Sequence, residues 1–83
     1  MTIHDMSALE LELKELVADI IEIGPEEITK NADFVNDLGM DSMQALEILA
    51  AVEKQYSIQM PEEYLGKITT FSELFELTKE SLR

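Results

Sequence analysis

A serine that follows two aspartates is the side chain of this sequence best placed to carry chemistry. Ser42 stands directly after Asp41, Asp37 lies about one helical turn upstream, and the stretch reads Asp37-Leu38-Gly39-Met40-Asp41-Ser42-Met43. A glycine-containing loop here leads into apolar residues at helical spacing. We therefore expect Ser42 at the start of a helix, where backbone N–H groups and the helix dipole favour a phosphate.

Two residues can cap this helix, and the choice decides whether the serine hydroxyl is free. Asp41 and Gln44 match the capping-box pattern, which would leave Ser42 at the first helical position with its hydroxyl unused. Serine is itself among the best capping residues, and in that role the backbone would occupy the hydroxyl. Because the single histidine, His4, lies near the N-terminus, a Ser-His-Asp arrangement is not expected. Ser42 would react only if another protein activated it.

The carboxylates mark neither a catalytic pair nor a metal site. They are so numerous that their pairing carries no information about acid–base chemistry. A calcium-loop register that starts at Asp33 puts Val35 at the third ligand position and Leu38 at the required glycine, and registers from Asn31 or Asp37 fail similarly. We expect no catalytic residue and no metal ligand, although loose binding of a divalent ion near Asp37 and Asp41 is compatible with the sequence.

The composition limits the kinds of partner. Eighteen acidic against six basic residues give a net charge of −12 over 83 residues, which disfavours nucleic acid and favours proteins with basic patches. Acidity that serves only solubility is the alternative. The chain has no cysteine, which suits a reducing compartment. We therefore expect a cytoplasmic monomer that is not membrane-embedded, with one domain over residues 1–83.

The elements around the serine are predicted to be helices. Apolar periodicity and turn signals predict helices over about 7–22, 41–55 and from residue 70 onward, with one or two helical turns at 61–65. Turn-forming residues fill the long connection over 25–40. The fold class is therefore all-α: a small four-helix bundle of three longer helices and one short helix, with a long loop between the first and second helices.

The spacing also predicts which side chains are buried. The long loop should be pinned to the core by Ile28, Phe34 and Leu38. Met43, beside the serine, is expected to stay exposed. The predicted buried stripes of the three longer helices are Leu9, Leu13, Leu16, Val17 and Ile20; Leu46, Leu49, Ala50 and Val52; and Phe71, Leu74, Phe75, Thr78 and Leu82.

On these residues the sequence resembles an acyl carrier protein. The stretch from Asp37 to Met43 is similar to the motif around the serine that carries 4′-phosphopantetheine in that family, and Glu47 follows at the usual place. The resemblance covers nearly the whole chain. Further matches in order and spacing are Phe34, Leu46, Leu49, Val52, Tyr56, the Met60-Pro61 step and Ile68-Thr69-Thr70.

The resemblance implies a free-standing, non-catalytic carrier domain. A phosphopantetheinyl transferase would attach the arm of coenzyme A to Ser42, with Asp41 flanking it as helix cap, and the arm would hold acyl groups as thioesters for fatty-acid, polyketide or related lipid biosynthesis. Acyl-processing enzymes with basic patches would be the other partners. The residues expected to contact partner enzymes are Asp37, Met43, Leu46, Glu47 and Glu53.

Two departures from the family pattern bear on the pathway. Met43 stands where leucine is common, and methionine preserves an apolar contact of similar volume. Gln44 and Lys54 stand where many fatty-acid carriers have acidic residues, which favours a polyketide, a lipid-modifying or another specialised route over the housekeeping fatty-acid synthase. Two other functions stay open: an aminoacyl or peptidyl carrier, and an acidic helical interaction module without a prosthetic group.

Overall fold

A computed structural model describes residues 6–82, and over this range the chain forms three α-helices and two short 3-10 helices without a β-strand. The α-helices are α1 (Met6–Ile21), α2 (Ser42–Tyr56) and α3 (Phe71–Ser81). The 3-10 helices are η1 (Pro25–Glu27) and η2 (Glu62–Gly66). The all-α prediction is confirmed, with η2 as the short helix; η1 was not predicted. His4 lies outside the described residues.

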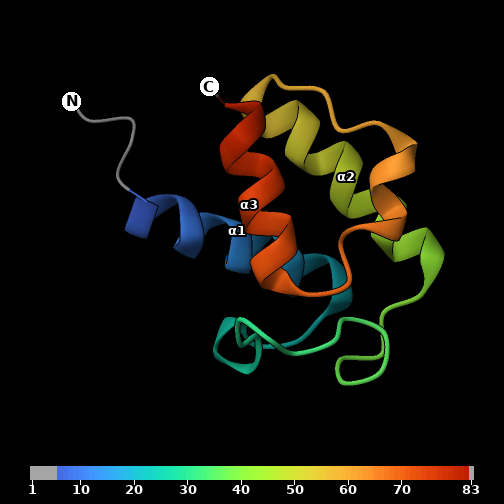
Figure 1. Cartoon of the computed structure of the whole chain (residues 1–83). Helices are drawn as coiled ribbons and strands as arrows, with labels where there is room; N and C mark the ends of the chain where they lie inside the picture. Colours follow the sequence, from blue (N-terminus) through green and yellow to red (C-terminus); the bar gives the residue numbers. More distant parts are fainter. Residues whose placement is uncertain (1–5, 83) are drawn as a thin grey trace.

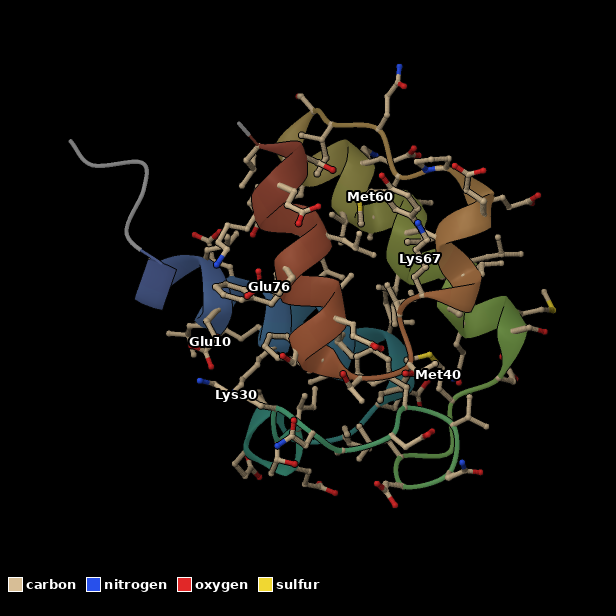
Figure 2. The ribbon with its side chains drawn as sticks, viewed as in Figure 1. Glu10, Lys30, Met40, Met60, Lys67 and Glu76 are labelled. Atoms are coloured by element: carbon tan, nitrogen blue, oxygen red, sulfur yellow. The ribbon has the colours of Figure 1, made fainter. Side chains whose placement is uncertain are left out.

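The three α-helices pack around one core, and α3 crosses in front of α1 in the view of Figure 1. The long loop between α1 and α2 packs against the core, where its Ile28 and Phe34 are buried as predicted. Met60, on the connection from α2 to η2, lies between α2 and α3 (Figure 2). The core therefore draws on the helices and on both long connections.

The buried stripe of α1 differs from the prediction by a rotation of the helix. Leu9, Leu13 and Val17 are buried as predicted, but the stripe continues through Ile21. Leu16 and Ile20 are only partly buried at its edge. Residues at strict i, i+4 spacing are each displaced slightly around the helix axis from the one before. Two neighbouring faces of α1 therefore fit the apolar pattern almost equally well. Packing against α2, η1 and α3 selects the face that is buried.

The same kind of error occurs in α2. Leu49 and Val52 are buried as predicted, but Ile48 takes the place expected for Leu46, which is 39% exposed. Ala50 is exposed as well. In α3, Phe71, Leu74 and Thr78 are buried and Phe75 is partly buried, whereas Leu82 follows the end of the helix and is exposed.

Candidate functional site

Asp41 caps α2 and leaves the serine hydroxyl free. Its backbone is extended, its carboxylate accepts a hydrogen bond from the Gln44 N–H at 2.8 Å, and its own N–H donates to the Gln44 side chain at 3.1 Å. The capping box predicted from the sequence is confirmed, and the alternative in which Ser42 caps the helix is wrong. Ser42 is exposed at the first helical position, and its hydroxyl makes no hydrogen bond to any described residue.

The end of the loop before Ser42 is a tight turn built on two aspartates. One carboxylate oxygen of Asp33 accepts the N–H groups of Val35 at 2.9 Å and Asn36 at 2.8 Å. The carboxylate of Asp37 accepts the Asp33 N–H at 2.8 Å. Asp37, predicted as a partner contact, thus also holds the turn, while its side chain remains exposed.

Gly39 and Met40 connect this turn to the helix. Gly39 has a φ of +75°, in the left-handed region that residues with a Cβ rarely adopt. Met40 is buried, and its N–H donates to the Phe34 carbonyl at 2.9 Å. Figure 2 shows Met40 where the loop meets the segment before α3. The left-handed backbone of Gly39 and the buried side chain of Met40 therefore set the direction in which the chain enters α2.

A second connection, between η2 and α3, supports the turn from the other side. The Phe34 N–H donates to the Thr69 carbonyl at 2.8 Å, and Asp33 forms an isolated β-bridge with Thr70. Glu73 accepts hydrogen bonds from the Thr69 hydroxyl at 2.6 Å and the Thr69 N–H at 2.8 Å. The Thr69 hydroxyl and then its N–H lower the pKa of the Glu73 carboxyl, because both bonds favour the ionised form.

A groove of about 330 Å³ opens between these two connections, with Ser42 at its edge. Its walls mix apolar side chains with carboxylates, an amide and hydroxyls. Val35 and Leu65 line the site and were not predicted from the sequence. The available signal at Val35 was a second apolar residue, directly after Phe34, among turn formers. The lining residues are Asp33, Phe34, Val35, Asn36, Met40, Asp41, Ser42, Ala45, Leu65, Ile68 and Thr69.

The residues predicted to meet partner enzymes fall into two groups. Met43 is 75% exposed, as predicted, and Leu46 and Glu47 are also exposed on the first turns of α2, next to Ser42. Glu53 lies near the other end of α2, where its carboxylate accepts the Met60 N–H at 2.7 Å in a partly buried position. The structure brings Asp37, Met43, Leu46 and Glu47 to the Ser42 end of the molecule and leaves Glu53 apart from them.

No group of three or more histidine, cysteine, aspartate or glutamate side chains among residues 6–82 could hold a metal ion. No helix in the same range is both long and apolar enough to cross a membrane.

Comparison with known proteins identifies the family. Residues 12–78 match the family model described as "Phosphopantetheine attachment site". The chain is 42% identical over 71 residues to the polyketide-8 synthase acyl carrier protein 2 of Streptomyces avermitilis, an alignment that covers 86% of this chain and 82% of that protein. In solved structures it is similar to the HMG-ACPI domain of the CurA module from Lyngbya majuscula. That match has 26% identity and a TM-score of 0.81 and covers 99% of this chain and 86% of that domain.

The chain therefore belongs to the phosphopantetheine-binding acyl carrier proteins. Members of this family carry acyl groups on a 4′-phosphopantetheine group and are in general non-catalytic, so an interaction module without a prosthetic group is set aside. The residues present fit this group. A free, exposed hydroxyl stands at a helix N-terminus, and the adjoining groove offers apolar walls for methyl and methylene groups and polar groups for amides.

Proposed function

We propose that Ser42 is the attachment point of 4′-phosphopantetheine and that the chain carries acyl intermediates of polyketide assembly. The observation that supports this most directly is the free hydroxyl of Ser42 at the first position of α2, beside a capped N-terminus. Once attached, the arm supplies a terminal thiol that holds an acyl group as a thioester. The polyketide route is supported by the Streptomyces relative and by Gln44 and Lys54 on α2.

In the attachment reaction this chain provides position and electrostatics, and the transferase provides the activation. The Ser42 oxygen forms a new bond to phosphorus as the diphosphate of coenzyme A is cleaved and adenosine 3′,5′-bisphosphate leaves. No described residue accepts a hydrogen bond from the Ser42 hydroxyl, so its proton must pass to a base that belongs to the transferase. The dipole at the start of α2 favours the resulting phosphodiester, while Asp41 opposes it modestly because both groups are exposed.

The groove and the exposed start of α2 would have separate roles after attachment. The groove beside Ser42 would receive part of the arm. Met43, Leu46 and Glu47 would meet enzymes with basic patches. The exposed carboxylate of Asp37 would belong to the same surface, although it also accepts the Asp33 N–H. Glu53 would lie outside the centre of this surface and would be less available to a partner, because its carboxylate accepts the Met60 N–H.

We further propose that residues 1–83 form a single carrier domain that acts as a monomer in the cytoplasm. The single core shared by all three α-helices supports one domain over the described residues. The cysteine-free, strongly acidic composition supports a reducing compartment and little tendency to self-associate.

Incubation with coenzyme A, magnesium and a broad-specificity phosphopantetheinyl transferase tests the attachment site. Mass spectrometry of the intact chain should show one added arm on the wild type and on Ser57→Ala, which removes another exposed serine hydroxyl on α2's C-terminal side. Ser42→Ala should gain none. An unmodified wild type would contradict the carrier assignment, and an arm that persists in Ser42→Ala would place the attachment elsewhere.

A further inference from the structure

A second groove lies away from Ser42, between α1 and α2. Its volume is about 480 Å³, and seven side chains line it. It is separate from the groove beside Ser42, with which it shares no lining residue. The lining residues are Glu12, Glu15, Leu16, Asp19 and Ile20 from α1, and Ala51 and Gln55 from α2.

The apolar part of this groove comes from α1 residues that pack at the edge of the core and stay partly exposed. Leu16 and Ile20 are only partly buried, at the edge of the core. On α2, Ala51 faces them, and its small side chain leaves the space between the helices open. A partly exposed aliphatic strip between two helices can receive one further aliphatic side chain.

The rim of the groove is acidic and lacks counter-charges. Glu12, Glu15 and Asp19 are exposed and follow one another at i, i+3 and i+7 on the same face of α1. The ion pairs formed among residues 6–82 use other carboxylates, those of Glu10 and Glu76, and no cation in this range pairs with the three rim residues. Like charges at these spacings repel and destabilise an isolated helix, so a cationic ligand here would relieve a repulsion that the fold leaves in place.

The positions of the carboxylates define the shape of a matching ligand. Asp19 follows Glu12 by seven positions of α-helix, a rise of about 10 Å. A helix that lies along the groove presents cationic side chains at i, i+3 or i+4, and i+7 at the same spacing, with an aliphatic residue between them. At one end of the groove the Tyr56 hydroxyl donates to Glu12 at 2.8 Å and joins the two helices, so the walls are held in place before any ligand binds.

We propose that the groove between α1 and α2 is a docking site for a basic amphipathic helix of a partner protein. Ala51 is nine residues, or about two and a half turns, after Ser42 and therefore on the opposite side of α2. A partner held here would leave the Ser42 end of the molecule open. The site does not depend on modification of Ser42, so the proposed function and this proposal can fail separately.

The binding of a synthetic peptide tests the proposal. The probe is a fluorescent 15-residue peptide of leucine, alanine and lysine with lysines at i, i+4 and i+7 beside an aliphatic stripe, measured by fluorescence anisotropy at low ionic strength. A peptide of the same composition in scrambled order controls for attraction to the overall negative charge. The helical peptide should bind at least tenfold more tightly than the scrambled one.

Two matched pairs of variants locate the binding. Glu15→Gln with Asp19→Gln should weaken binding about tenfold, whereas Glu62→Gln with Glu63→Gln, which removes two exposed charges from η2, should change it less than twofold. Ala51→Met fills the groove and should weaken binding at least fivefold. Ala50→Met adds the same atoms to the neighbouring, exposed position and should change it less than twofold.

Each comparison can overturn the proposal. Equal affinities for the ordered and scrambled peptides, or equal effects of the two charge-removing pairs, would show that only the net charge of the protein attracts the peptide. Equal effects of Ala51→Met and Ala50→Met would show that the groove is not occupied. Circular dichroism of every variant establishes that it is folded, and the charge-removing pair tests the proposal without any change of packing.

Discussion

Replacing Thr78 by valine should stabilise the protein. Thr78 is completely buried on the inner face of α3, and its hydroxyl has no hydrogen-bond partner among the described residues. A buried hydroxyl without a partner costs about 1–3 kcal/mol of desolvation. Valine has nearly the same shape, so the exchange removes the unpaired hydroxyl without leaving a cavity and places a methyl group in the core.

The expected gain in the free energy of unfolding is about 1–2 kcal/mol. For a domain of this size, each kcal/mol raises the melting temperature by roughly 4–8 °C. Urea unfolding followed by circular dichroism at 222 nm measures the gain, and the dependence on urea should keep its slope because the native fold is unchanged. Thr29→Val, the same exchange at an exposed loop position, should stay within about 0.5 kcal/mol of the wild type.

A loss of stability in Thr78→Val would refute this reasoning. It would mean that the hydroxyl is satisfied in solution, by the carbonyl one turn earlier in α3 or by a buried water. Thr78→Ser separates the two contributions of the side chain, because it keeps the hydroxyl and removes the methyl group. This variant should lose about 1 kcal/mol through the small cavity it creates.

Three further predictions concern the elements that position the site. Asp41→Ala removes the cap of α2 and should lower the free energy of unfolding by about 0.5–2 kcal/mol in urea titrations, whereas Asp41→Asn should retain most of it. Gly39→Ala forces a Cβ into the left-handed region and should cost about 1–2 kcal/mol in the same assay. Burial and the Glu12 hydrogen bond raise the pKa of Tyr56 to about 12, from an ordinary value of 10.0. The wild type should therefore lose stability relative to Tyr56→Phe as pH rises from about 10 to 12, and parallel stability curves of the two proteins across that window would contradict the shift.

The centre of the site could be predicted from the sequence because its signals are local. The capping box at Asp41 and Gln44 spans only four residues, and the structure confirms it with a 2.8 Å bond. The exposure of Met43 follows from the same short helical turn. By contrast, the groove beside Ser42 joins Val35 of the loop to Leu65 of η2. No local pattern indicates that two segments so far apart in the sequence meet.

The helices could also be predicted, but their rotation could not. Apolar residues in α1 are dense enough that Ile20 and Ile21 both fit a helical stripe, and only the tertiary packing of α1 decides that Ile21 is buried. Ile48 and Leu46 pose the same choice in α2. The carboxylate of Glu53 was expected at the surface, and its bond to the Met60 N–H depends on the path of the connection to η2, which has no periodicity.

Capping of α2 by Asp41 and not by Ser42 suits the proposed attachment at Ser42. A serine that caps a helix must accept a backbone N–H through its side-chain oxygen, and that oxygen is the atom that would be esterified in the modified protein. Capping by Ser42 would therefore couple the stability of α2 to its modification. Because Asp41 accepts the Gln44 N–H instead, the proposed esterification of Ser42 would leave the cap of the helix in place. In the modified protein the aspartate would lie next to the phosphodiester, at a modest electrostatic cost because both groups are exposed.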